Sequence, residues 1–243
     1  TNYYKRSAAI YRDPSAWYHF TAVWDTTNGT ASDRIRIYCN GERITTFSVS
    51  ADPSSSLSGY VNVSGATHYI GKRNTAYVDG YMAQPVFINN QALTPSSFGQ
   101  DKNGIWVPKS VSGLTFGTNG FYLDFADSAA LGNDVSGNNN DFTVSGLTAS
   151  DQMTDTPTNN YATFNPLFTY TTSLVAYSEG NLKAGNTSGS WRNAVSTIAC
   201  PLTGKWYWEV SPSAVGSNMI QLGYLDNGLF GQCQVNWYSW YQT

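Results

Sequence analysis

The chain has 243 residues, of which 41% are hydrophobic, 15% aromatic and only 12% charged. This composition supports a sizeable core and is typical of a β protein whose surface carries Ser, Thr, Asn and Gly in place of Lys and Glu. The net charge of −3 provides no basic field for a phosphate backbone, and no apolar run approaches the length of a membrane span. We therefore expect no nucleic-acid binding and no membrane insertion.

Alternation of polar and apolar residues dominates the first part of the chain, and helical periodicity is nearly absent. The first predicted strand covers residues 17–25. The next alternating stretch, at residues 34–39, is followed by Asn40-Gly41 and a second arm at residues 42–47. Both residues of an Asn-Gly pair tolerate the positive φ that a tight type I′ turn requires, so this stretch predicts a β-hairpin.

Three further strands are predicted before residue 100, at residues 60–63, 68–71 and 80–88. Proline cannot donate a hydrogen bond to a strand ladder, so Pro85 places the last of them at a sheet edge or a bulge. At residues 94–98, Thr followed by Pro is typical of an N-cap and a first helical residue, which predicts one short helical turn.

The rest of the chain is interpreted as a connector and a second β region. Residues 100–160 form the connector, in which the clearest strand is predicted at residues 121–125. A second β region follows at residues 161–243, with its best strand at residues 205–210. Many short strands separated by turn residues predict an all-β fold, namely an antiparallel β-sandwich of the jelly-roll kind followed by a partial second β-sandwich.

Several segments occur in the order of consecutive strands of one known superfamily. They are Trp17-Tyr18-His19-Phe20, Asp25, Ile37-Tyr38-Cys39-Asn40-Gly41, Tyr69-Ile70-Gly71 and Asp79-Gly80-Tyr81-Met82-Ala83. Together they resemble the concanavalin A-like (laminin G-like) lectin/glucanase superfamily. Residues 90–99 resemble the version of this module in marine phage and viral-metagenome proteins, and residues 204–210 resemble the opening of a SPRY-like sandwich.

The resemblance implies a domain organisation. Residues 1–99 would form the lectin-like sandwich, with its N-terminal strands missing, and residues 161–243 would begin the SPRY-like domain. The chain begins with Thr1 in place of Met, and its last residues look like a strand near the start of a domain. We therefore expect the chain to be a piece of a longer protein.

Carboxylates and histidines are too few and too scattered to predict catalysis. Glycoside hydrolysis needs two carboxylates that flank the scissile bond. The chain has three glutamates, Glu42, Glu179 and Glu209, and each is isolated from the others in the sequence. His19 and His68 are the two histidines that could act as a base, and no nucleophile motif accompanies them. We therefore predict that the protein is not an enzyme.

Aromatic residues in loops are the best candidates for ligand binding. Most aromatic side chains on strands are core residues, because rings dominate the packing of β proteins. Tyr77 and Trp191 lie outside the clearest strand patterns and are the two candidates for a glycan platform. For each of them, structural packing is the alternative role.

An oxygen-rich loop is the best candidate for a metal site. Asp134, Asn138, Asn140 and Asp141 lie close together, with Ser136 between them, and their oxygens are ligands of the kind that calcium prefers. A purely structural turn is the favoured interpretation, because Asp and Asn favour turn conformations. We predict no obligatory cofactor and leave calcium open.

The function we expect is that of a non-enzymatic virion structural or adhesion protein with a lectin-like module, such as a phage tail fibre, an appendage or a capsid-decorating protein. The resemblance implies a location on the virion or an extracellular surface. Its expected partners are other virion proteins, further copies of the chain in a homo-oligomer such as a trimer, and a cell-surface glycan. The alternatives are a carbohydrate-binding module of a secreted or surface bacterial protein and, less favoured, a glycoside hydrolase.

Overall fold

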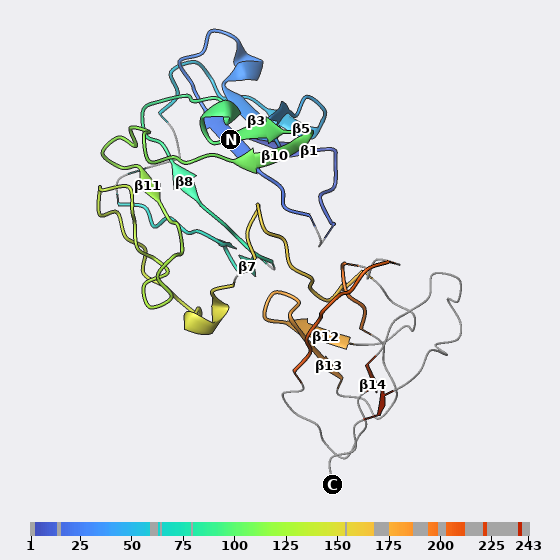
Figure 1. The fold of residues 1–243 in the computed structure, drawn as a ribbon. Helices are drawn as coiled ribbons and strands as arrows, with labels where there is room; N and C mark the ends of the chain where they lie inside the picture. Colours follow the sequence, from blue (N-terminus) through green and yellow to red (C-terminus); the bar gives the residue numbers. More distant parts are fainter. Residues whose placement is uncertain are drawn as a thin grey trace.

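A computed structural model describes residues 3–13, 16–58, 63, 65–78, 80–153, 155–167, 175–186, 194–198, 203–211, 221–222 and 238–239. Within these residues all paired strands are antiparallel, and the helical elements are three single turns of 3-10 helix (Figure 1). The prediction of an all-β antiparallel fold is confirmed. No helix in the described part of the chain is long and apolar enough to cross a membrane.

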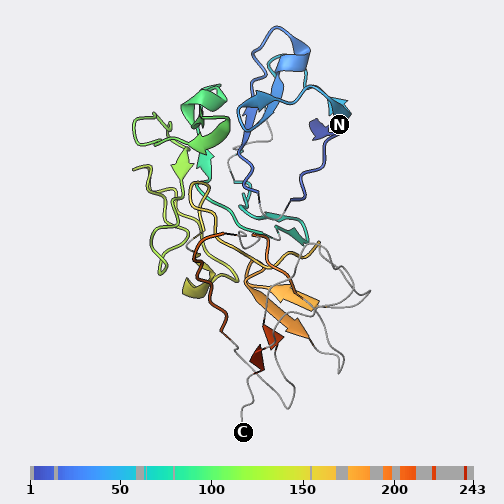
Figure 2. The same ribbon diagram turned by 45° about the vertical axis from the view of Figure 1, so that its right-hand side comes forward.

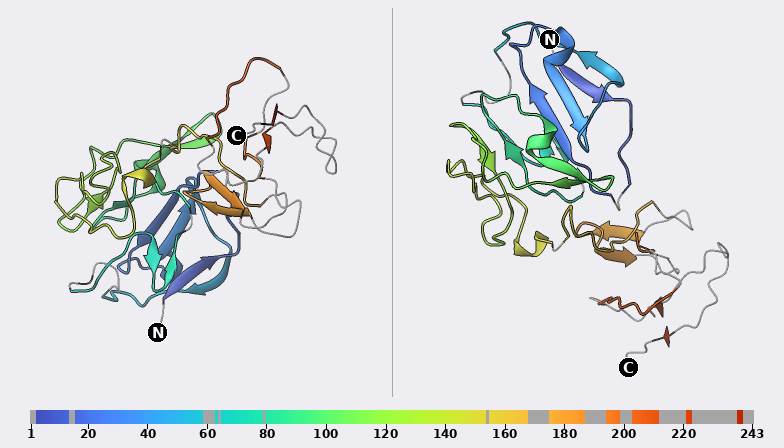
Figure 3. Two further views of the ribbon diagram at one scale, coloured as in Figure 1. Left: turned by 90° about the horizontal axis from the view of Figure 1, so that it is seen from below. Right: turned by 45° about the horizontal axis from the view of Figure 1, so that its top comes forward.

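Residues 4–51 form two neighbouring sheets. One sheet pairs β1 (Tyr4–Ser7) with β5 (Phe47–Ala51). The other has the order β2 (Phe20–Trp24), β3 (Ile35–Cys39) and β4 (Glu42–Arg43), and the turn η1 (Ala31–Asp33) connects β2 to β3. The right-hand view of Figure 3 shows these strands, in blue, gathered at one end of the molecule.

The predicted hairpin is present between β3 and β4. Asn40 and Gly41 have φ angles of 48° and 83°, as a type I′ turn requires. The prediction that its second arm extends to residue 47 is wrong, because β4 ends at Arg43. Phe47 instead begins β5 and pairs with Ser7 of β1, a strand that the alternation pattern did not indicate.

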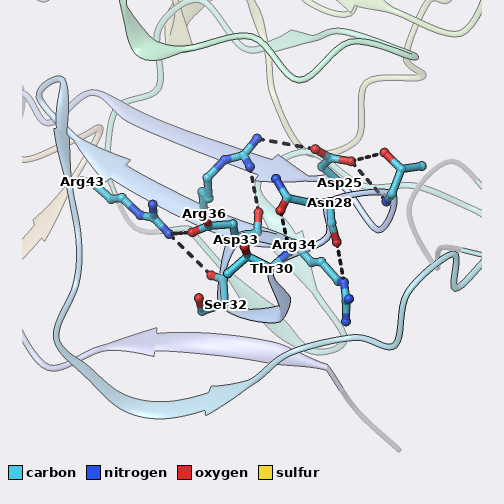
Figure 4. A network of polar contacts seen from close by, with 9 residues as sticks. Asp25, Asn28, Thr30, Ser32, Asp33, Arg34, Arg36 and Arg43 are labelled. Carbon is cyan, nitrogen blue, oxygen red and sulfur yellow. Dashed lines mark hydrogen bonds and ion pairs between the residues drawn. The ribbon is translucent and has the colours of Figure 1, made fainter.

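Polar contacts hold the loop between β2 and β3 against its neighbours (Figure 4). The Arg34 guanidinium donates to the carbonyl oxygens of Asn28 and Pro53, each at 2.9 Å. Arg36 lies 3.8 Å from the Asp25 carboxylate, and Arg43 of β4 pairs with Asp33 of η1. These arginines donate hydrogen bonds to loop carbonyls or form ion pairs with loop carboxylates. The network is therefore structural.

Residues 72–108 contain two hairpins and, between them, one further strand. The hairpin of β6 (Lys72–Arg73) and β7 (Ala76–Tyr77) comes first. β8 (Val86–Phe87) follows, then the turn η2 (Pro95–Ser97) at the site predicted for a helical turn. β9 (Gly99–Lys102) and β10 (Ile105–Pro108) form a hairpin across Asn103 and Gly104, whose φ angles are 58° and 83°.

Most of the buried apolar side chains of the described residues lie in the segment predicted as a connector. They are Val111, Phe116, Leu123 and Leu131, and two others, Val23 and Ile35, come from β2 and β3. β11 (Phe121–Tyr122) pairs with β8, and the fully buried Leu123 donates its N–H to the Pro85 carbonyl. The connector therefore covers the β8 edge with a core of its own.

Three more strands are shorter than predicted, and the first is that of residues 17–25, where β2 covers Phe20–Trp24. The strand predicted at residues 80–88 is reduced to Val86–Phe87, since Gln84 has a φ of 54° immediately before Pro85. The strand predicted at residues 121–125 ends at Tyr122, and Phe125 has a φ of 55°. A residue in the left-handed region cannot continue an extended strand, so each change of φ sets a boundary.

The remaining elements are η3 (Ala149–Asp151), β12 (Val175–Ser178), β13 (Lys183–Asn186), β14 (Gln221–Leu222) and β15 (Tyr238–Ser239). β12 pairs with β13, and β14 pairs with β15. Residues 205–210, predicted as the best strand of this part, are not in a strand. Of the strand predicted at residues 68–71 no residue is in a strand, and residues 60–62 lie outside the described residues.

The β12–β13 hairpin lies apart from strands β1–β11, and Tyr81 contacts it at the turn between β12 and β13 (Figures 1 and 2). The Trp17 indole N–H donates to Asp155 Oδ2 at 3.2 Å, and the Tyr81 hydroxyl donates to the Glu179 carbonyl at 3.2 Å. The two rings stack with centroids 6.4 Å apart. Burial, together with the charges of Asp155 and Glu179, raises the pKa of Tyr81 to about 12, so the hydroxyl stays a donor.

Candidate functional site

The β6–β7 hairpin presents the candidate ligand residue Tyr77. Lys72 and Tyr77 are directly paired across the two strands, and the Val78 N–H donates to the Gly71 carbonyl at 2.8 Å, which extends the ladder. The turn is made at Asn74, whose φ of 53° suits an asparagine. Side chains of directly opposite residues share one face of a sheet, so Lys72 and Tyr77 lie together.

Two exposed tyrosines lie close to the Lys72 ammonium. The Lys72 ammonium lies 5.0 Å from the ring centre of Tyr69 and 5.4 Å from that of Tyr77. Tyr77 is 72% exposed and Tyr69 57% exposed. The two ring centres are at most about 10 Å apart, because each lies about 5 Å from the same nitrogen. We call this set, Tyr69, Lys72 and Tyr77, the tyrosine–lysine surface.

The electrostatics of the tyrosine–lysine surface are those of an unpaired cation. Among the described residues, Lys72 has no ion-pair partner, and residues 65–78 contain no carboxylate. Arg73 pairs with Ala76 and points to the opposite face of the hairpin, because neighbouring strand residues alternate. Asp79 follows in the sequence and lies outside the described residues.

This arrangement can hold a ring-shaped polar ligand. The face of a tyrosine ring is electronegative, so it attracts polarised C–H groups such as those of a sugar ring, and the hydroxyl group remains available for hydrogen bonds. The three N–H groups of a lysine can donate to ligand oxygens. Tyr69 and Lys72 were not among the predicted site residues. The sequence signal that could have found Lys72 is Asn74, a residue typical of tight turns. A turn at Asn74 implies a hairpin in which Lys72 pairs with Tyr77.

The other candidate glycan residue, Trp191, lies outside the described residues. The tyrosine–lysine surface is therefore built from Tyr77 and from residues close to it in the sequence.

The candidate calcium loop is organised around Asp134, which is 5% exposed. Asp134 Oδ1 accepts hydrogen bonds from the backbone N–H groups of Tyr122 and Ser136, at 2.8 and 2.9 Å. Asp134 Oδ2 accepts from the Ser136 hydroxyl and from the Asn140 N–H, each at 2.9 Å. Burial raises the pKa of Asp134, but these donors together lower it below its ordinary value of 3.8.

The other predicted calcium ligands also bind the protein itself. Asp141 Oδ1 accepts from the Asp134 N–H at 2.8 Å. The side-chain amides of Asn138 and Asn140 both donate to the Gly120 carbonyl, at 2.9 and 2.8 Å. In the part of the chain that the structure describes, no group of three or more His, Cys, Asp or Glu side chains could hold a metal ion. These contacts support the structural turn, and calcium stays the alternative.

The residues considered for catalysis lie in separate places. Glu42 is in β4, Glu179 is in the turn after β12, and Glu209 accepts a hydrogen bond from the Tyr207 hydroxyl at 3.1 Å. His19 packs beside Trp106, with ring centroids 5.9 Å apart, and burial lowers its pKa. The three glutamates thus come from three different segments, and His19 is a packed residue.

The chain was compared with known protein families, proteins and structures. No protein-family model, no curated protein and no solved structure matches this chain.

Proposed function

We propose that this protein is a non-enzymatic adhesion protein that binds glycans on its tyrosine–lysine surface. The observation that carries the proposal is that Tyr69 and Tyr77, both largely exposed, each lie within about 5 Å of the Lys72 ammonium. Exposed tyrosines held by a hairpin lose little conformational freedom on binding, because each has only two side-chain torsions. Such a surface is suited to binding a ligand without chemical change.

The setting proposed for this activity is a virion or another extracellular surface, where the protein would assemble with other virion proteins as a homo-oligomer. A surface poor in charge and rich in Ser, Thr and Asn supports this setting, as does the sequence resemblance to a lectin-like module of phage type. A carbohydrate-binding module of a secreted or surface bacterial protein would use the same tyrosine–lysine surface. The jelly-roll sandwich and the SPRY-like second domain stay predictions.

The test is glycan binding by the whole chain and by Tyr77→Ala. On a glycan array followed by titration of the best ligand, Tyr77→Ala should weaken binding about tenfold, because an aromatic contact contributes about 0.5–1.5 kcal/mol beyond its buried area. Tyr69→Ala should have a similar effect.

The matched control is Tyr207→Ala. Tyr207 is 85% exposed and belongs to residues 205–210, far from Tyr77 in the sequence. The control should bind as the unmodified protein does. Equal binding by Tyr77→Ala, Tyr69→Ala and the control, or an array with no bound glycan, would overturn the proposal.

A further inference from the structure

Lys72 gives the tyrosine–lysine surface a charge that a neutral sugar does not need. A platform for neutral sugars needs aromatic faces and hydrogen-bonding groups, and a full positive charge adds little to it. Here the ammonium lies close to both rings, 5.0 and 5.4 Å from their centres. Any ligand that stacks on either tyrosine therefore brings its substituents close to this cation.

We infer that the glycan is acidic, with an anionic substituent that pairs with the Lys72 ammonium while its sugar rings contact Tyr69 and Tyr77. This inference rests on the proposed glycan-binding function and names its ligand class. The shared chemistry is an anionic oxygen on the sugar, supplied by a carboxylate or by a sulfate ester.

The charge distribution of the chain supports this ligand class. The whole chain carries a net charge of −3, so it repels an acidic polymer at long range. Residues 65–78 carry Lys72 and Arg73 and no carboxylate. Within residues 65–78 the charged side chains are therefore all positive, which is complementary to a negative ligand.

The N–H groups of the Lys72 ammonium can donate hydrogen bonds to the anionic oxygen of the ligand. No described residue accepts a hydrogen bond from the Lys72 ammonium, and its contacts with the two tyrosine rings are with their faces. Hydrogen bonds between charged partners are shorter and about twice as strong as those between neutral groups. An anionic oxygen therefore binds here better than a hydroxyl group of a neutral sugar.

The experiment uses an array that prints acidic glycans beside neutral counterparts. Uronic-acid and sialic-acid glycans are paired with their carboxyl-reduced forms, and sulfated glycans with their desulfated forms, so the two sources of anionic oxygen are separated. The whole chain should prefer the acidic member of at least one pair by about fivefold, the size expected for a partly exposed ion pair. The preference should decrease from 0.1 to 1 M salt, because salt screens exposed charges.

Two variants of the same hairpin separate the local contact from net charge. Lys72→Gln and Arg73→Gln each remove one positive charge, but only Lys72 contacts the tyrosine rings. Lys72→Gln should abolish the preference for the acidic form, and Arg73→Gln should keep it. Equal melting temperatures would show that both variants are folded.

The outcomes distinguish the two proposals. Equal binding of acidic and neutral forms, lost in Tyr77→Ala and unchanged in Lys72→Gln, would overturn the acidic ligand and keep the glycan-binding function. A preference for acidic forms that Arg73→Gln weakens as much as Lys72→Gln would also overturn the role of Lys72. Absence of binding to every printed glycan would overturn the proposed function and the ligand class together.

Discussion

Asp134 is the residue on which the segment after β11 depends most. Its two carboxylate oxygens accept four hydrogen bonds, three of them from backbone N–H groups on both sides of the loop. The side chain is almost fully buried, so water cannot replace these bonds. The carboxylate oxygens of Asp134 in this oxygen-rich loop are therefore occupied by hydrogen-bond donors of the protein itself.

We expect Asp134→Ala to lower the free energy of unfolding by about 3 kcal/mol, because buried N–H groups left without an acceptor cost about 1–3 kcal/mol each. Asp134→Asn should cost nearly as much, since its amide nitrogen would face donors. The matched control is Asp127→Asn, whose carboxylate accepts one bond from the Ala129 N–H in an exposed turn. Denaturant unfolding of the three variants measures the difference.

Two results would contradict this structural role. One is an Asp134→Ala variant as stable as Asp127→Asn. The other is a rise in the melting temperature of the unmodified protein on addition of millimolar calcium, which would show that the loop oxygens bind the ion in preference to the backbone donors.

The contribution of Asp134 should depend on pH. Its pKa in the folded protein lies below the ordinary value of 3.8, so the folded state favours the ionised form. The stabilisation is therefore fully present above the unfolded pKa and is lost as the pH falls through the folded pKa. The stability difference between the unmodified protein and Asp134→Asn should be constant from about pH 7 to pH 5 and shrink below the unfolded value of about 3.9. A difference that grows on acidification would show the opposite linkage.

At the scale of elements, Trp106 couples two hairpins. Its indole ring lies against Gly41 in the β3–β4 turn and against Gly99 at the start of β9. A Cβ atom at either glycine would lie 2.4 Å from the ring. The absence of a side chain at both positions therefore lets one tryptophan join the β9–β10 hairpin to the β3–β4 hairpin.

We expect Gly99→Ala to destabilise the protein by about 1–3 kcal/mol, the usual cost of adding a methyl group where there is no room. Gly99 has no positive φ, so the effect is steric and not conformational. The control is Gly29→Ala, because a Cβ atom at Gly29 meets nothing within 4 Å. Thermal unfolding compares the two variants.

The same substitution in a Trp106→Leu protein tests why Gly99→Ala lowers the stability. In a Trp106→Leu protein the smaller side chain leaves space, so Gly99→Ala should cost less there than in the unmodified protein. The same cost in both backgrounds would show that contact with the indole ring is not the reason.

At the scale of the whole molecule, the junction at Tyr81 joins the β12–β13 hairpin to the first part of the chain. Gly180 has a φ of 59°, and a Cβ atom there would lie 2.2 Å from the Tyr81 ring. The Trp17 indole and the Tyr81 hydroxyl add one hydrogen bond each, to Asp155 and to Glu179. The Tyr81 hydroxyl and the Tyr81 ring thus contact the hairpin itself, and Trp17 contacts Asp155, which precedes the hairpin in the chain.

Gly180→Ala should separate these parts. Steric overlap with Tyr81 and the left-handed backbone should together raise hydrogen exchange at residues 175–186 by about tenfold, the equivalent of 1.4 kcal/mol, while exchange in β2 and β3 stays unchanged. The control is Gly185→Ala in β13 of the same hairpin, where a Cβ atom meets only the Ala176 carbonyl at 3.9 Å. Equal exchange in the two variants would show that the junction does not hold the hairpin.

The sequence by itself determined the fold class and one supersecondary element. Alternation with a period of two predicted the all-β class, and the Asn40-Gly41 pair predicted the β3–β4 turn, because both depend on local steric rules. Asn103-Gly104 carries the same signal and forms the β9–β10 turn, so that hairpin was predictable as well. The prediction that Tyr77 lies in a loop was wrong, because Tyr77 belongs to β7, where its side chain is nevertheless exposed.

The tertiary structure decided the properties that join distant residues. The pairing of β1 with β5 brings together segments about 40 residues apart, and no local pattern encodes such a partner. The backbone donors around Asp134 include Tyr122, so the role of the oxygen-rich loop depended on its position against β11. The ligand surface likewise needed the contacts of Lys72 with both tyrosine rings, because composition gives residue types and only folding sets their distances.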